Sequence, residues 1–203
     1  IVAGLENHAG AQKHGRMGQH IVVAVAGEHG VDRADPQRIG AMRCGVAYQG
    51  FERQGVAEAA VGAGAEAVMT GECPSGTDRV AAAVAHRDEW EIIVNVQGDE
   101  PLIAPAMIQA AVAPLLADHS IPMGTLRAPL TSLDEFRNPN VVKVVTDRQG
   151  FALYFSRAPI PYPRDFAEQL EQRWSELATA KHVGLYVYRR SFLLDYPHLP
   201  KTP

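Results

Sequence analysis

Apolar and polar positions fall into short blocks along the chain, and from residue 56 onward the blocks alternate between two types. Short apolar runs with β-branched residues predict buried strands, and longer alanine-rich runs predict helices. In chain order the pattern predicts a helix over 56–61, a strand over 66–69, a helix over 80–85, a strand over 92–96 and a helix over 104–117 that Pro114 kinks or ends. This alternation is typical of an α/β fold with a mostly parallel sheet flanked by helices.

The second half of the chain departs from this alternation with a predicted β-hairpin excursion. Its strands are expected over 141–146 and 151–156, with a turn over 147–150 between them. The proline-rich segment 158–163 cannot form a helix and is expected to run along the surface. A last strand over 182–188 alternates polar with aliphatic residues, so its two faces differ in character.

The segment before residue 56 carries a weaker pattern. Residues 21–26 form an apolar run that fits either a strand or part of a helix. Residues 10–15 contain two glycines and Lys13, but they lack the spacing of a Walker loop, so an ordinary surface loop is favoured over a phosphate site.

Composition narrows the class of protein. With 203 residues, of which 46% are hydrophobic, the chain is long enough for one domain with a sizeable core. A formal charge of −4 without a Lys/Arg cluster argues against a nucleic-acid surface, and no apolar run is long enough to span a bilayer. Cys44 and Cys73 have no CxxC spacing, which fits a reducing cytosol. We therefore expect a cytoplasmic protein with neither a nucleic-acid nor a membrane partner.

The most informative stretch is the strand over 92–96 and the polar residues after it. Gln97, Gly98, Asp99 and Glu100 stand where the strand emerges, and open α/β sheets bind ligands at the carboxyl ends of their strands. The two adjacent acids point in different directions, so they are not expected to share a proton. Asp99 suits a hard cation such as Mg²⁺, bound together with substrate phosphates. An acidic turn that leads into the next helix explains the same residues equally well.

The residues before the helix over 80–85 form a second candidate site. Ser75 or Thr77 can cap this helix. The free amides of its first turn, together with Arg79, fit the polar edge of a base or an anion. A plain helix cap is the simpler explanation, and the local sequence favours it.

Polar residues near the hairpin form a third candidate site. Arg157 follows the strand over 151–156 and is placed to receive a carboxylate, whose planar shape a guanidinium matches. In the last strand His182, Tyr186 and Tyr188 share one face. That face looks into a cleft or across a subunit contact, or else its tyrosines pack at a sheet edge.

Five blocks in the second part of the chain give it a specific resemblance. They are P-S-G-T-D-R at 74–79, V-N-V-Q-G-D-E-P at 94–101, N-P-N-V-V-K-V-V at 138–145, G-F-A-L-Y-F-S-R-A-P-I-P at 150–161 and K-H-V-G-L-Y-V-Y-R at 181–189. Over about residues 56–203 the chain resembles the 3-deoxy-manno-octulosonate cytidylyltransferases. The resemblance implies transfer of CMP from CTP to the sugar acid Kdo with release of pyrophosphate, for lipopolysaccharide synthesis. It also implies a Rossmann-like nucleotide-diphospho-sugar transferase fold and a cytoplasmic homodimer.

The resemblance further implies roles for individual residues. By this resemblance the catalytic residues are Asp99, which also holds Mg²⁺, and Lys13; the nucleotide-binding residues are Ser75, Gly76, Thr77 and Arg79; the sugar-binding residues are Gln97, Arg157, His182 and Tyr186. Residues 1–203 would form a single nucleotidyltransferase domain, within which residues 138–190 bind the sugar and form the dimer contact.

The chain also departs from the family pattern. In the family motif I-P-A-R-x-x-S-x-R-L-P-G-K two arginines and a lysine grip the triphosphate, whereas here Gly4 and Ala9 replace the arginines and only Lys13 aligns with the lysine. The sequence ends at Pro203, before two later family segments, so we expect a domain truncated at its C-terminal end relative to the family. Because one charge-stabilising group is typically worth ~10²–10³ in rate, these losses are expected to slow the reaction. Two alternatives stay open: an acylneuraminate cytidylyltransferase, and a non-catalytic module that binds a sugar acid or forms a dimer.

Overall fold

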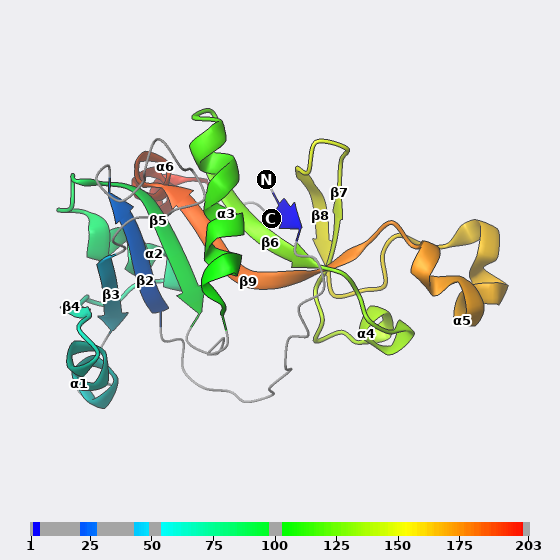
Figure 1. Ribbon diagram of the computed structural model, residues 1–203, viewed down its shortest axis with the longest axis horizontal. Coiled ribbons are helices and arrows are strands. Elements are labelled where there is room, and N and C mark those ends of the chain that lie inside the picture. Colours follow the sequence, from blue (N-terminus) through cyan, green and yellow to red (C-terminus); the bar gives the residue numbers. More distant parts are fainter. Residues whose placement is uncertain (1, 5–20, 28–42, 49–53, 98–102, 201–203) are drawn as a thin grey trace.

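The computed structural model describes residues 2–4, 21–27, 43–48, 54–97 and 103–200 of the chain. Within these ranges nine strands form one sheet, and helices cover both of its faces (Figure 1). The strands are β1 (Val2–Gly4), β2 (Ile21–Gly27), β3 (Arg43–Tyr48), β4 (Glu66–Met69), β5 (Trp90–Gln97), β6 (Met123–Ala128), β7 (Lys143–Thr146), β8 (Ala152–Ser156) and β9 (Ala180–Arg189). The α-helices are α1 (Gln54–Gly62), α2 (Gly76–Val84), α3 (Pro105–Ala117), α4 (Leu133–Arg137), α5 (Leu170–Arg173) and α6 (Arg190–Asp195), and short 3₁₀ helices span Arg164–Gln169, Trp174–Glu176 and Tyr196–His198.

The order of strands shows that the predicted parallel sheet is wrong. The main sheet has the order β1-β6-β9-β5-β2-β3-β4, while β7 pairs with β9 and β8 pairs with β7. Among the described strands only β1 with β6 and β3 with β4 are parallel neighbours. The other pairs are antiparallel: β2 and β9 run against β5, which lies between them, β3 runs against β2, β6 and β7 run against β9, and β8 runs against β7. The α/β class is confirmed, but an apolar strand indicates only that both its faces are buried and not the direction of its neighbours.

The core has two layers, one on each face of β5. Val94 packs with Leu115 of α3 on one face. Ile93 packs with Val80 of α2 and Leu193 of α6 on the other. In Figure 1, α3 lies in front of the sheet, and α2 and α6 lie behind it. Because successive side chains of a strand point to opposite faces, one continuous apolar run supplies both layers.

The predicted hairpin is confirmed, with strands slightly shorter than expected. Lys143 pairs with Ser156 at its open end. The turn is closed by the Asp147 side chain, which accepts hydrogen bonds from the amides of Gln149 (2.9 Å) and Phe151 (2.8 Å). Gly150 has a φ of +87°, a conformation that glycine adopts without strain. Together with α4 and α5, the hairpin projects from one end of the main sheet (Figure 1).

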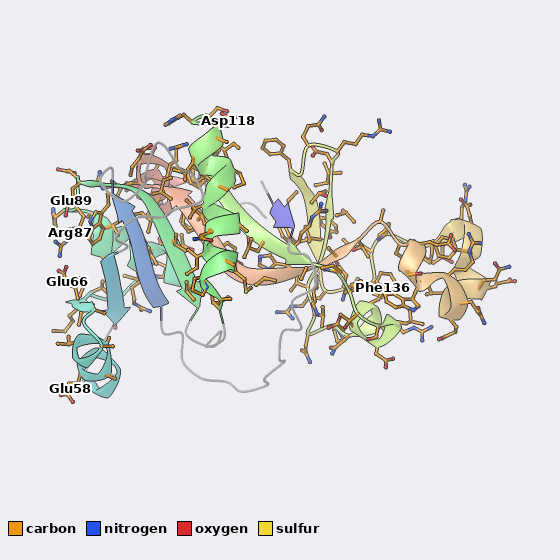
Figure 2. All side chains as sticks on the ribbon, in the orientation of Figure 1. Glu58, Glu66, Arg87, Glu89, Asp118 and Phe136 are labelled. Atoms are coloured by element: carbon orange, nitrogen blue, oxygen red, sulfur yellow. The ribbon has the colours of Figure 1, made fainter. Side chains whose placement is uncertain are left out.

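Helix α4 anchors this projecting part. Its N-cap Ser132 accepts a hydrogen bond from the Glu135 amide, and the Glu135 carboxylate accepts one from the Thr131 amide in return. Phe136 is buried, and Figure 2 places it at the base of the hairpin. Glu135 also pairs with Lys181 at 2.6 Å, which joins α4 to β9.

The remaining predictions concern single elements. The ambiguous run over 21–26 is strand β2, and the predicted helices correspond to α1, α2 and α3. Pro114 does not end α3, which continues to Ala117. Residues 118–137 carried no prediction, although they contain β6 and α4. None of the described helices is long and apolar enough to cross a bilayer.

Candidate functional site

The candidate site lies where β5 and β6 end, on either side of β9. Because β5 and β6 both run antiparallel to β9, they point in the same direction and their carboxyl ends meet at its beginning. Val96 lies opposite Leu185, and Arg127 lies opposite His182. Gln97 is the last residue of β5, and nothing beyond its backbone is described. Open α/β sheets bind ligands at the carboxyl ends of strands that point the same way. Strands β5 and β6 point the same way here, although the reversed strand β9 lies between them.

A row of aromatic rings follows one face of β9. The rings of Phe155 and His182 are 5.2 Å apart, those of His182 and Tyr186 are 5.4 Å apart, and those of Tyr186 and Tyr188 are 6.3 Å apart. The opposite face carries Leu185, which packs in the α3 layer. The prediction that His182, Tyr186 and Tyr188 share one face is confirmed. Packing at a sheet edge is excluded, because β9 has β5 and β6 as neighbours.

Helix α2 brings the predicted nucleotide segment to the same face. The Tyr188 hydroxyl is hydrogen-bonded by the side chains of Thr77, in the first turn of α2, and Asn95, in β5. Burial outweighs these bonds and raises the pKa of Tyr188 to about 12, so the phenol stays protonated. Asn95 is 1% exposed, and it lies opposite Tyr186 across the strand pair. Thr77 and Tyr186 thus each lie next to Tyr188.

The start of α2 is organised by its own cap. Ser75 is the N-cap: its hydroxyl accepts a hydrogen bond from the Asp78 amide and donates one to the Asp78 carboxylate. Gly76 is the first residue of the helix, and Arg79 is buried in its first turn. The plain helix cap is therefore present. It leaves the role of this segment toward a nucleotide as a proposal, because capping and ligand binding use different amides.

His182 is neutral over the ordinary pH range. Its Nε2 lies 2.8 Å from the Thr125 hydroxyl, and the ring is enclosed by Phe155 and Tyr186. Burial disfavours the charged imidazolium and lowers the pKa of His182 to about 4. At neutral pH the ring therefore offers one N–H donor and one nitrogen lone pair.

The lowered pKa predicts how stability depends on pH. Between about pH 6.5 and pH 4 unfolded His182 binds a proton that folded His182 rejects, so the free energy of unfolding falls as the pH falls. The loss is at most about 3 kcal/mol, and it is absent above the unfolded pKa. The free energy of unfolding can be measured by urea titration of the wild type and of His182→Gln from pH 4 to pH 7.5. Below about pH 6.5 it should fall more steeply with falling pH in the wild type, and above pH 6.5 the two proteins should show the same pH dependence. The same pH dependence of the free energy of unfolding in both proteins would contradict the half-buried, neutral ring.

Arg157 is held at the end of β8 by a buried lysine. The Lys143 ammonium group donates to the backbone carbonyls of Asn138 (2.9 Å), Val141 (2.7 Å) and Arg157 (2.7 Å), and the side chain is 0% exposed. The Arg157 guanidinium donates to the Pro139 carbonyl at 2.9 Å, in the same turn. The backbone of Arg157 is thus bonded to Lys143 at the start of β7, and its guanidinium is bonded to the turn before β7. The role of Lys143 was not predicted, although a lone charge inside the apolar run V-V-K-V-V indicates a buried ammonium group that needs hydrogen-bond acceptors.

The hairpin places Arg157 at the same end of the sheet as His182. Lys143 lies opposite Ser156 on one side and opposite Lys181 on the other. Arg157 and His182 are the next residues of their strands, and one strand separates them. With strands ~4.8 Å apart, their backbones are roughly 10 Å from each other, a span that a small sugar acid can bridge.

Two predicted residues lie outside the described part of the chain. These are Asp99, the predicted metal ligand, and Lys13. Among the residues that the structure does describe, no cluster of three or more His, Cys, Asp or Glu side chains is arranged to hold a metal. The role of Asp99 as a metal ligand therefore stays a prediction.

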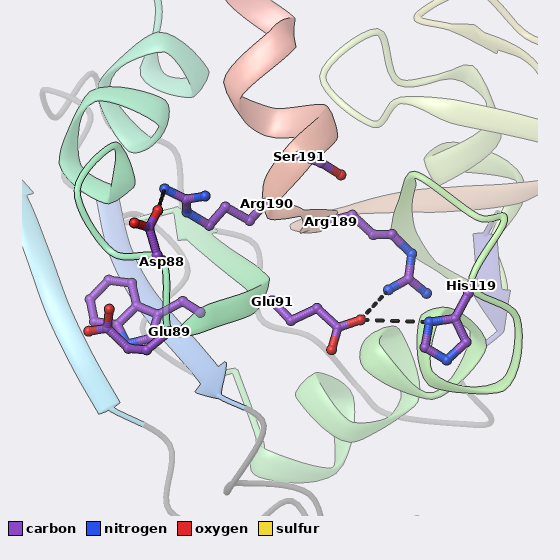
Figure 3. A pocket seen from close by; sticks show the side chains of 8 residues that line it. Asp88, Glu89, Glu91, His119, Arg189, Arg190 and Ser191 are labelled. Carbon is purple, nitrogen blue, oxygen red and sulfur yellow. Dashed lines mark hydrogen bonds and ion pairs between the residues drawn. The ribbon is translucent and has the colours of Figure 1, made fainter.

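A separate hollow of about 450 Å³ lies at the opposite end of β5 and β9 (Figure 3). Arg189 pairs there with Glu91 at 2.9 Å, and Arg190 pairs with Asp88 at 2.7 Å. The same arginines donate to carbonyl groups at the ends of α3 and α2. Arg189 is the last residue of β9, whereas His182 lies near its beginning. We assign this hollow to the attachment of the two helices to β9 and not to ligand binding, because both guanidinium groups already form ion pairs with carboxylates.

Comparisons with known proteins agree with this geometry. A family model described as Cytidylyltransferase matches residues 52–203. The 3-deoxy-manno-octulosonate cytidylyltransferases of Syntrophotalea carbinolica and Geobacter metallireducens are each 55% identical to the chain over 73% of its length and over 60% and 59% of their own. The chain therefore spans about 60% of the length of these relatives. A solved structure of CMP:2-keto-3-deoxy-manno-octonic acid synthetase complexed with CTP superimposes with a TM-score of 0.68 at 36% identity, covering 80% of this chain and 63% of that one.

Proposed function

The chain belongs to the cytidylyltransferase family, and from that premise we propose that it transfers CMP from CTP to 3-deoxy-D-manno-octulosonate, releasing pyrophosphate. The product would serve lipopolysaccharide synthesis in the cytoplasm. One observation carries the proposal: the start of α2 and the aromatic row of β9 meet on one face of the sheet, around the Tyr188 hydroxyl. A nucleotide and a sugar bound at these two places would be neighbours. The solved structure that matches at 36% identity supports a Rossmann-like nucleotide-diphospho-sugar transferase fold over a single domain, with most neighbouring strands antiparallel in this chain.

Each side of the site has its own chemistry. The cytosine would lie beside Ser75, Gly76 and Thr77, where backbone amides and hydroxyls can distinguish one base from another. The sugar acid would lie between Arg157 and His182. A guanidinium forms two parallel hydrogen bonds with a carboxylate, which favours an acid over a neutral sugar. Gln97 and Tyr186 would bind sugar hydroxyl groups, and Arg79 would support the nucleotide side.

We propose Mg²⁺ as the cofactor, held by Asp99. Strand β5 ends at Gln97, next to the first half of β9, and Asp99 follows two residues later in the sequence. One carboxylate with substrate phosphates is a common Mg²⁺ donor set. When bound, the cation would neutralise charge on the phosphates. Lys13 would add a positive charge at the triphosphate.

The reaction needs no covalent enzyme intermediate. The anomeric hydroxyl of Kdo would attack the α-phosphorus of CTP in line, forming the new oxygen–phosphorus bond as the bond to pyrophosphate breaks. The hydroxyl proton passes to solvent or to the departing phosphate. The protein would contribute mainly by positioning the two substrates and by stabilising charge, as in other transfers to phosphorus.

We also propose a homodimer formed through the hairpin region of residues 138–190. Strand β8 pairs only with β7 among the described strands, and its apolar side chains face outward, with Leu153 67% and Tyr154 61% exposed. An exposed apolar strand of this kind is typical of a protein contact. Sedimentation should show a dimer for the wild type. The dissociation constant of the dimer should be higher for Leu153→Lys, because a charge would replace an apolar side chain in the contact.

A pyrophosphate-release assay with CTP, Mg²⁺ and Kdo tests the activity. Turnover that requires all three supports the proposal. Turnover only with N-acetylneuraminate would replace it by an acylneuraminate cytidylyltransferase. Binding of Kdo without turnover under any condition would leave a non-catalytic sugar-acid-binding module.

A further inference from the structure

The pairing of β6 with β9 contains an irregularity next to His182, on the side of the site where we place the sugar acid. Thr125 lies opposite Tyr186, but the next residue, Leu126, lies opposite Val183. Gly184 and Leu185 therefore have no partner on β6. Irregularities of this kind bend a strand and re-aim its side chains, and they are frequent next to binding sites.

The Thr125 side chain occupies this irregularity. It is 5% exposed, and its oxygen lies 2.8 Å from the Leu185 carbonyl, 3.3 Å from the Val183 carbonyl and 2.8 Å from His182 Nε2. A hydroxyl group has one proton to donate and lone pairs to accept with. Carbonyl oxygens can only accept, so the proton of Thr125 points to a carbonyl, and the contact with His182 is left to a lone pair. The hydrogen of that contact therefore belongs to Nε2.

We propose that Thr125 holds His182 in the Nε2–H tautomer, so that Nδ1 presents a lone pair that accepts a hydrogen bond from a hydroxyl group of the bound sugar acid. The assignment of the ligand rests on the proposed function, whereas the assignment of the tautomer rests on the geometry alone. Thr125 is a positioning residue, because it acts through His182.

This tautomer divides the recognition of the sugar acid between two residues. An ionised carboxylate can only accept hydrogen bonds, so it finds no partner at a nitrogen lone pair. The carboxylate is therefore left to Arg157, and His182 selects a hydroxyl. The lowered pKa of His182 agrees with this division, because a ring that resists protonation stays an acceptor. The flanking rings of Phe155 and Tyr186 limit rotation of the imidazole.

Nitrogen NMR of the histidine side chains tests the tautomer without any ligand. In the wild type at pH 7, Nε2 of His182 should resonate as a protonated nitrogen and Nδ1 as an unprotonated one. Thr125→Val should increase the population with hydrogen on Nδ1, and Thr125→Ser, which restores the hydroxyl, should behave as the wild type. Thr179→Val is the matched control, because Thr179 donates to the Val144 carbonyl and has no histidine contact among the described residues. An unprotonated Nε2 in the wild type would overturn the proposal.

Binding of Kdo and of its singly deoxygenated analogues tests the ligand. One neutral hydrogen bond is worth up to about tenfold in affinity, so Thr125→Val should raise the Kd of Kdo by ~10-fold and leave the Kd of CTP unchanged. One deoxygenated analogue should bind the wild type ~10-fold more weakly than Kdo does, and His182→Phe should bind both equally. If no analogue shows this coupling, His182 does not select a hydroxyl. If the wild type binds no Kdo at all, the proposed function fails together with the ligand assignment, while the NMR result still decides the tautomer.

Discussion

Replacing Lys143 by methionine is expected to lower the free energy of unfolding by about 2–4 kcal/mol, because the backbone carbonyls of Asn138, Val141 and Arg157 each lose a hydrogen bond to the ammonium group. Methionine fills a similar volume but cannot donate a hydrogen bond. The Lys143 side chain is 0% exposed, and its three acceptors lie within 2.9 Å. Burial, and secondarily the charge of Arg157, lowers the pKa of Lys143, so its charge offsets part of what its hydrogen bonds contribute.

The same substitution is expected to act on the sugar side of the site. The Arg157 carbonyl shares the Lys143 ammonium group with the carbonyls of the Asn138–Val141 turn, and its guanidinium donates to a carbonyl within that turn. Once the ammonium group is removed, this turn is free to move, and the Kd of Kdo should rise while the Kd of CTP changes little.

Lys181→Met is the matched control for Lys143→Met. Lys181 lies directly opposite Lys143, but it is partly exposed, and its ammonium group pairs with a single carboxylate, that of Glu135. We expect a smaller loss, of about 1 kcal/mol. Urea unfolding and calorimetric titration measure the two quantities. A Lys143→Met variant as stable as the wild type would show that the three carbonyls find other donors.

Replacing Asp99 by asparagine is expected to reduce kcat by ~10²–10³-fold or more, because a ligand of the cation that stabilises the departing pyrophosphate would be lost. Asparagine keeps the shape of the side chain and removes its charge. The melting temperature should therefore stay near that of the wild type. Turnover should also require more Mg²⁺ than it does in the wild type.

The neighbouring acid supplies the control for Asp99→Asn. Glu100→Gln removes the same charge from the same stretch of sequence without removing the proposed metal ligand. We expect Glu100→Gln to retain most of the activity in the pyrophosphate assay. Equal loss in both variants would indicate a general electrostatic effect, and no loss in Asp99→Asn would show that the cation is held elsewhere.

Much of the fold could be read from the sequence. Strand β4 begins and ends where the pattern predicted, and α1, α2 and α3 differ from the predicted helices only at their ends. The turn residues at 147–150 predicted the hairpin, and Gly150 adopts the positive φ that such a turn requires. These elements were legible because their signals are local: a period of apolar residues, a cap or a turn.

The site could be predicted in part. Alternation along the last strand grouped His182 with Tyr186 and Tyr188, and the structure confirms that grouping. Asn95 and Thr125 were missed, because a single polar residue in an apolar strand carries no sign of its partner. Their partners are distant in sequence: Thr125 meets His182 only where β6 and β9 pair.

The sequence by itself determined helices α1, α2 and α3, strands β4 and β5, the hairpin and the two faces of the last strand, since these depend on residues within a few positions of one another. Only the tertiary structure decided that β9 runs between β5 and β6 in the opposite direction, and that the start of α2 lies over the same face. A buried strand satisfies its hydrogen bonds equally with parallel or antiparallel neighbours, so its own residues leave the choice open. The antiparallel direction of β9 brings the ends of β5 and β6 to His182, and this direction depends on the packing of the whole sheet.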